Sequence, residues 1–342
     1  MALVRCSLIE GGSGQLFYRG IETIYFITIC EVFANFAPDM KGSLLRQRLK
    51  PWMLPIAMAG GVLFHDCIEY VGFLTPYLIF VMLYVTFCKI NFRHISVTRL
   101  MWALLAIQVV GAAIIYVAIA GVSRDVAQGL MICVLCPTAT AAPVVTGMLG
   151  GNVARLVTYS LMSNVTAALI APLFLSVAGS VDVDILTSSG QICSHVAPLI
   201  LGPLILAQIT SRVAPKVHHA VADHQGLSFY LWAVSLLIVV GRSVSFILAS
   251  PAGALPEIIV LAIGAGVVCV GQFAIGRRVG YRMGDRISGA QGLGQKNTVL
   301  AIWLALTYLN PISSVAPAAY IAWQNSINSW QLFHYQKAIS RG

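Results

Sequence analysis

Long apolar stretches follow one another along the chain from residue 51 onward, and they constrain the fold more than any other feature. Several are about 17 to 25 residues long, the length that an α-helix needs to cross the roughly 30 Å hydrocarbon core of a membrane. Only 10% of the 342 residues are charged, whereas soluble domains carry about 25% charged residues. We therefore predict an all-α protein that crosses the membrane many times.

The basic residues indicate how many crossings there are. Loops rich in lysine and arginine, such as RQRLK before residue 51 and GRRVGYRMGDR at 276–286, alternate with neutral or acidic loops when ten segments are counted. Because basic loops stay in the cytoplasm, both termini are expected on the cytoplasmic side of a plasma (inner) membrane. The expected helix cores are 51–64, 74–90, 100–120, 127–149, 157–178, 192–210, 228–248, 256–275, 287–308 and 313–332.

Ten segments divide into two halves of five, and an odd number in each half turns the second half upside down relative to the first. This inverted-repeat plan is typical of secondary transporters, which bind their cargo near mid-membrane at broken helices. The expected repeats cover 51–178 and 191–335. An N-terminal extension over 1–50 precedes them, in which an interfacial helix at 21–38 is favoured over a further span because it contains two glutamates.

The fourth and ninth expected segments carry matching interruptions. In MICVLCPTATAAPVVTG, Pro137 and Pro143 flank Thr138 and Thr140, and a proline removes a backbone donor and disfavours helix at the preceding residue. SGAQGLGQKNT at 288–298 holds three glycines among polar residues, and each glycine weakens a helix by up to about 1 kcal/mol. Backbone groups that a break frees inside a membrane need partners within the protein. The pair of breaks is therefore the predicted site.

A lysine lies in the second break, where a membrane helix tolerates charge poorly. Lys296 is flanked by Gln295 and Asn297, and an apolar run follows it. Two interpretations stay open at this point. The amine extends to the cytoplasmic interface, or it serves as a fixed cation within a site.

Two further polar positions have open interpretations. Gln108 lies in the middle of the third segment, where its amide either joins two helices by hydrogen bonds or serves the site at the breaks. Asn325 belongs to a polar stripe of the tenth segment, which either packs against another helix or lines a path.

Several classes of function are disfavoured. No Asp or Glu lies at the centre of an expected segment, whereas proton and sodium antiporters generally need such a carboxylate. No nucleophile with a base and no histidine cluster is present in the membrane segments, so an enzyme is not expected. Cys133 and Cys136 lack a second pair of metal ligands. The net charge of +9 lies mostly in short loops, so nucleic acid is not an expected partner.

These motifs resemble those of the bile acid:sodium symporter family over about residues 51 to 335. The resemblance depends on CPTATAAP and GGNVA at the first break, GQKNTVLA at the second and WQNSINS in the tenth segment. It implies a ten-helix inverted-repeat transporter of organic anions, whose cargo binds between two domains and moves by alternating access. The implied core domain is 100–178 with 256–332, and the implied panel domain is 51–90 with 192–248.

The resemblance also implies two sodium ions behind the crossing helices, yet this chain departs from the pattern. Ala142 and Pro143 stand where the family has Ser-Asn, Gly292 stands for a glutamate and Leu156 for a hydroxyl residue. Lys296 stands for a glutamine, unless a one-residue shift aligns Gln295 there instead. The positions that match are Gln108, Thr140, Ser160, Asn297 and Thr298.

We therefore expect a secondary transporter of a small organic anion, bile acid-like or another carboxylate, with sodium coupling weakened or absent. Lys296 would replace a bound cation, with Gln108 and Ser160 as its partners. The alternative is a passive channel or a non-transporting membrane receptor on the same fold. The lipid bilayer is the other expected partner, no cofactor is expected, sodium stays doubtful, and a monomer is compatible with the sequence. The expected cargo residues are Thr138, Thr140, Pro143, Gln295, Asn297, Thr298 and Asn325.

Overall fold

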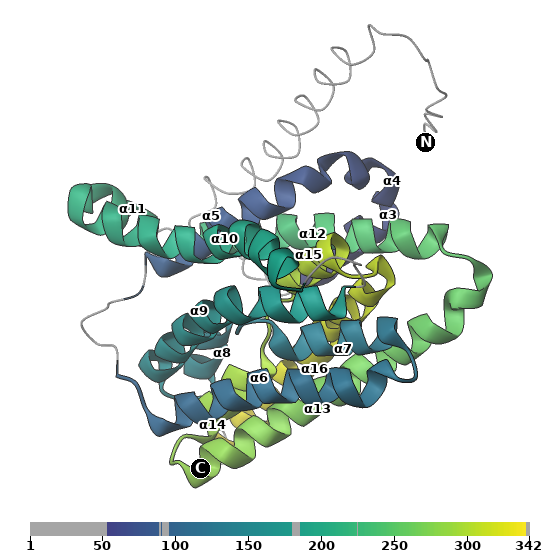
Figure 1. Ribbon diagram of the computed structural model, residues 1–342. Coiled ribbons are helices and arrows are strands. Elements are labelled where there is room, and N and C mark those ends of the chain that lie inside the picture. Colours follow the sequence, from purple (N-terminus) through teal and green to yellow (C-terminus); the bar gives the residue numbers. More distant parts are fainter. Residues whose placement is uncertain (1–52, 89, 91–95, 180–184, 224, 340–342) are drawn as a thin grey trace, which may run out of the picture. The chain divides into compact units, whose positions relative to one another are not determined.

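The computed structural model describes residues 53–88, 90, 96–179, 185–223 and 225–339 (Figure 1). Over these residues the chain is helical, and its β-type pairing is limited to one isolated bridge. The expected extension over 1–50, with its interfacial helix, lies outside the described residues. The chain divides into two compact units at Ala57 and Met58, and the packing described below is that of the second unit.

Within the described part, six helices are long and apolar enough to cross a membrane, by length and composition. The prediction of an all-α membrane protein is thus confirmed. The six spans are Tyr70–Phe87, Arg99–Ala120, Val153–Ala178, Ile185–Val213, Tyr230–Ala249 and Leu255–Arg282.

The helices follow one another with short connections. The first half of the chain contains α3 (Met53–Leu63), α4 (His65–Ile68), the 3-10 helix η2 (Glu69–Leu74), α5 (Thr75–Phe87), α6 (Arg99–Ala120), α7 (Arg124–Leu135), α8 (Ala142–Met148) and α9 (Val153–Ala178). The second half contains α10 (Ile185–Val213), α11 (Pro215–Asp223), α12 (Gln225–Ala249), η4 (Ala252–Ala254), α13 (Leu255–Arg282), α14 (Arg286–Gly294), α15 (Thr298–Tyr308), η5 (Pro311–Ser314) and α16 (Val315–Ile339).

Two regions differ from the expected segments. The first expected core, 51–64, is followed without a loop by α4 and η2. The basic segment after the sixth core, expected as a loop, forms α11, which begins at Pro215. A proline suits the first position of a helix because its missing N–H would have no partner there.

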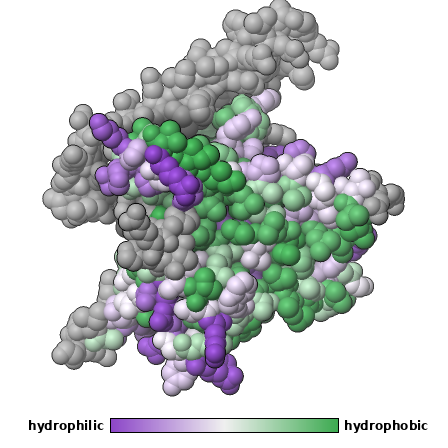
Figure 2. All heavy atoms as spheres, turned by 60° about the vertical axis from the view of Figure 1, so that its left-hand side comes forward, coloured by the Kyte–Doolittle hydropathy of each residue, from purple (hydrophilic) through white to green (hydrophobic). Residues whose placement is uncertain are grey.

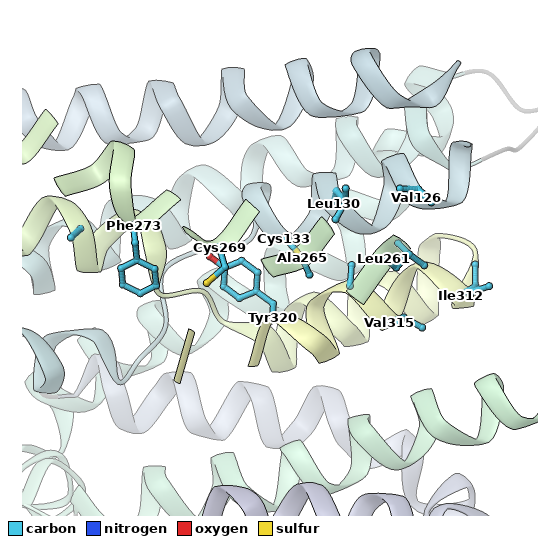
Figure 3. Packing of buried hydrophobic residues seen from close by; sticks show 12 residues of the cluster. Val126, Leu130, Cys133, Leu261, Ala265, Cys269, Phe273, Ile312, Val315 and Tyr320 are labelled. Atoms are coloured by element: carbon cyan, nitrogen blue, oxygen red, sulfur yellow. The ribbon is translucent and has the colours of Figure 1, made fainter. Parts of the chain in front are cut away.

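The helices of the second unit pack in two groups. In one, α13 contacts α14, α16 and α7, and α6 contacts α7; in the other, α10 and α12 both contact α5 (Figure 1). Helix α9 contacts α6 of the first group and α10 of the second, and so joins the two groups. Where α7, α13 and α16 meet, Leu130, Leu261, Phe273 and Tyr320 belong to one buried cluster (Figure 3).

Large apolar side chains remain exposed on the outer faces of the long helices. Ile114 and Val117 on α6 and Ile263 and Val267 on α13 are examples. Figure 2 shows a broad hydrophobic area on one face, with hydrophilic residues gathered at its margins. Soluble monomers rarely expose such patches, so these faces are expected to contact lipid.

The glycines of the ninth expected segment do not interrupt the helix. Gly289 lies inside α14, where a Cβ atom would lie 2.8 Å from the Cα of Gly280 and would also meet the carbonyl oxygen of Gly276. Gly289, and likewise Gly294 beside the Phe273 ring, therefore let α13 and α14 approach closely, as small residues do between membrane helices. The break comes directly after them, at residues 295–297.

Candidate functional site

Two helices are broken in the described part of the second unit, and their breaks lie against each other. The first break separates α7 from α8 over 136–141, and the second separates α14 from α15 over 295–297. Thr138 and Lys296 form an antiparallel bridge at this crossing. Both interruptions predicted from the sequence are therefore present.

The two breaks satisfy each other's backbone groups. The Ala139 amide donates to the Gln295 carbonyl at 3.0 Å, and the Asn297 amide donates to the Pro137 carbonyl at 2.8 Å. Because the membrane interior offers no water, such mutual bonding is what allows extended backbone at this depth.

The residues at the breaks explain where the helices end. Cys136, which precedes Pro137, is extended with ψ of 145°, as expected before a proline. Asn297 starts α15 as its N-cap, since its side-chain oxygen accepts from the Leu300 amide at 3.2 Å.

Lys296 lies inside the protein, with 1% of its surface exposed. Its ammonium donates to the carbonyl oxygens of Val134 at 2.7 Å and Cys136 at 3.0 Å. These carbonyls belong to the last turn of α7, which carries the negative end of the helix dipole and lacks intrahelical partners. The ammonium thus caps the broken end of α7 and does not extend to the surface.

Gln108 completes this cap. Its Nε2 donates to the Leu135 carbonyl at 2.7 Å, so lysine and glutamine together bind three consecutive carbonyls. Its Oε1 accepts from Ser163 Oγ at 2.9 Å and from Tyr159 Oη at 3.3 Å. Gln108 therefore fixes the end of α7 to α9.

Lys296 has no anionic partner among the described residues, where ion-pair contacts join only His65 to Asp66 and Arg155 to Asp285. Its charge is balanced by carbonyl dipoles alone. Burying an ammonium with only carbonyl dipoles as partners costs free energy of folding. An ionisable residue kept at such a depth therefore indicates a functional site.

The other expected cation-site residue, Ser160, is buried on α9, but no hydrogen bond joins its side chain to Lys296 or Gln108 in the described region. Ser163, one turn further along α9, makes the contact instead and also accepts from the Thr138 amide at 3.2 Å. The sequence shows a run of polar residues at this point of the fifth segment, but it does not show which of them faces Gln108.

The expected cargo residues divide by burial. Thr138, Gln295, Asn297 and Thr298 are buried at the crossing. Thr140 and Pro143 are partly exposed.

Asn325 donates to Ile321 within its own helix α16. Its neighbour Gln324, which the sequence did not single out, accepts from the Lys296 amide at 3.0 Å. The contact from α16 to the break therefore comes from Gln324.

Three of the positions implied for sodium ligands, Ala142, Leu156 and Gly292, carry no side-chain oxygen that could bind a sodium ion. Ala142 and Leu156 are fully buried in an apolar cluster with Tyr159 and Leu293. A Cβ atom at Gly292 would lie 2.8 Å from the Tyr159 ring, so this ring fills the space of a side chain there. No group of three or more His, Cys, Asp or Glu suited to a metal exists among the described residues.

A helical membrane protein with two crossing broken helices and a polar centre has the features of a transporter. Comparison with protein families bears this out, because the SBF-like CPA transporter family matches residues 87–319, which include both breaks. The chain belongs to this family, and the resemblance to bile acid:sodium symporters is confirmed. A search of curated proteins found no match to the chain.

Proposed function

We propose that the chain is a secondary-active transporter that moves a small organic anion, bile acid-like or another carboxylate, by alternating access. The observation that carries this proposal is the ammonium of Lys296, buried at the crossing of two broken helices with no carboxylate of the described residues to neutralise it. A fixed positive charge at such a crossing suits an anionic cargo.

The proposed architecture has ten segments in two inverted repeats, 51–178 and 191–335. The broken pairs α7–α8 and α14–α15 would be the fourth segment of each repeat, which supports the division. The group of α6, α7, α13, α14 and α16 would belong to the core domain, and the group of α5, α10 and α12 to the panel domain. Motion between the two groups would expose the crossing to each side in turn.

The orientation belongs to the same proposal. Arg277, Arg278 and Arg282 at the end of α13 and Lys216 on α11 are exposed. By the positive-inside rule this side would be cytoplasmic. With ten segments both termini would lie in the cytoplasm, and the proposed location is a plasma (inner) membrane.

The lysine would do what a bound sodium ion does elsewhere in such folds. Sodium needs several oxygen ligands, but three of the implied positions hold Ala142, Leu156 and Gly292, which lack a side-chain oxygen. An ammonium is a compact charge with three donors, and two of these are bound to α7 carbonyls. Transport would then proceed without sodium.

The start of α15 supports an anion near the lysine. Asn297 Nδ2 is buried and has no hydrogen-bond partner in the structure, and a buried donor without a partner is rare. The N-terminus of α15 adds the positive end of a helix dipole at the same place. A carboxylate arriving there would accept from this donor.

The test is uptake of a labelled bile acid, a labelled 2-keto acid and labelled pantoate into vesicles that contain the purified chain. We expect saturable uptake of at least one of them, with counterflow exchange, at equal rates in sodium and choline buffers. Lys296→Gln should lose this uptake or make it sodium-dependent.

Other outcomes of the uptake experiment would favour the alternative functions. Non-saturable flux would support a passive channel, and binding without flux would support a receptor. Strict sodium dependence of the unaltered chain would overturn the role of the lysine but leave transport standing.

A further inference from the structure

A groove of about 450 Å³ lies between α6 and α13, with α7 as its floor. Both long helices pack against α7, but they contact each other only over a short stretch (Figure 1). Ile107 and Ile115 line the α6 side, Val267 and Ile275 line the α13 side, and Val134 lies at the floor. The groove is thus a cleft between helices rather than a part of the crossing itself.

Glycines create the hollow, and its wall is apolar. Gly111, Gly264 and Gly271 line it, and a Cβ atom at Gly271 would meet no other atom within 4 Å. Gln272 also lines it, but its Nε2 donates inward to Tyr320 Oη at 3.0 Å and to the Cys133 carbonyl at 3.3 Å. The wall that an occupant would meet is thus almost entirely apolar, although Gln272 Oε1 is buried without a hydrogen-bond partner.

The groove is continuous with the face expected to contact lipid. Val110 and Ile114 on α6 are 53% and 61% exposed, and Val267 and Val270 on α13 are 68% and 54% exposed. A cleft in such a face is open to acyl chains and unattractive to water.

Basic residues lie at one end of the groove. Ile107 of α6 and Val279 of α13 pack on the same buried cluster, so the start of α6 lies beside the end of α13. Arg99 lies in the same row of α6 as Ile107, two four-residue steps earlier, and Arg278 lies one turn beyond Ile275 of α13. Both arginines are exposed, and neither takes part in an ion pair of the described residues.

We propose that this groove binds an anionic phospholipid, with one acyl chain between α6 and α13 and the phosphate between Arg99 and Arg278. Basic residues next to a cleft between membrane helices are the arrangement that recognises anionic headgroups. The acyl chain would contact Val134, whose carbonyl accepts from Lys296. The bound lipid would therefore support the end of α7 that the lysine caps.

The headgroup part is tested on the purified, delipidated full chain in detergent by native mass spectrometry. The probes are phosphatidylglycerol and phosphatidylcholine with identical acyl chains. We expect the unaltered chain to retain phosphatidylglycerol in preference to phosphatidylcholine. Each arginine should contribute about fivefold in affinity, so R99Q with R278Q should weaken phosphatidylglycerol about 25-fold and leave phosphatidylcholine unchanged.

The matched control for the headgroup is R277Q, which removes an exposed arginine from the neighbouring position of α13 and should change affinity less than twofold. Equal retention of the two lipids by the unaltered chain would overturn the proposal. An equal loss in R277Q and in the double variant would do the same.

The acyl part is tested with G271L, which places a side chain into the open space of the groove. It should reduce retention of both lipids at least tenfold. G190L is the control, because Gly190 is also helical with open space around it but lies on α10. Equal retention by G271L and G190L would overturn the groove as the acyl site. If G271L fails to fold, the arginine variants still decide the proposal.

Discussion

Replacing Lys296 with methionine is expected to lower uptake at least 100-fold. Methionine has a similar volume but no donor, so the Val134 carbonyl would lose its bond to the ammonium, and the Cys136 carbonyl would keep only the longer bond from Gln108 Nε2 at 3.4 Å. Each buried carbonyl left unsatisfied costs about 1–3 kcal/mol. The fixed charge that would attract the anion is lost as well, and about 3 kcal/mol already corresponds to 100-fold. The measurement is initial uptake into vesicles with equal amounts of folded protein.

Lys216→Met is the matched control for this change. Lys216 is exposed on α11, so its replacement should leave uptake within twofold of the unaltered chain. The melting temperature of each variant separates a loss of transport from a loss of folding. Uptake by Lys296→Met equal to that of Lys216→Met would remove the lysine from the mechanism.

Replacing Gly289 with valine is expected to prevent stable folding. The added side chain would meet backbone atoms of Gly276 and Gly280, which cannot move without separating α13 from α14. Overpacking of this kind costs about 1–3 kcal/mol or more, and here the clash is with backbone on a long helix. We expect a fall of more than 10 °C in the melting temperature, as about 3 kcal/mol would produce in a domain of moderate size, or no folded protein at all.

The control for the glycine prediction is Gly190→Val in α10, where a Cβ atom meets nothing within 4 Å. Its melting temperature should stay within a few degrees of the unaltered chain or rise slightly, because only helix propensity changes and valine is a better helix former than glycine. Size-exclusion chromatography of heated samples provides both values. Equal stability of the two variants would show that α13 and α14 are not closely packed at Gly289.

The sequence predicts the helices and the first break well, because each has a local cause. Apolar length determines the spans, and Pro137 removes a donor at a fixed point of the chain. The predicted second interruption, 288–298, contains the observed break at 295–297, but the glycines to which it was attributed lie within α14 and serve packing. Glycine weakens a helix in isolation, but contact with α13 outweighs that tendency here.

The contacts at the site could not be derived from the sequence, because they join distant segments. Whether Lys296 reached the surface depended on carbonyls at the end of α7, about 160 residues earlier. Gln324 and Asn325 are neighbours that point about 100° apart on a helix, and only the packing of α16 selects Gln324 for the contact. The sequence also does not show that the Tyr159 ring fills the space beside Gly292 or that its hydroxyl donates to Gln108.

If the Lys296 ammonium holds the place that a sodium ion would otherwise take at the crossing, sodium should not stabilise the folded protein. The most direct measurement is the melting temperature of the purified, unaltered chain as sodium chloride replaces choline chloride at constant ionic strength. A ligand that binds the folded state raises this temperature in a saturable way. We expect no change across the series, and a saturable rise of several degrees with sodium would show that the ion binds despite Lys296.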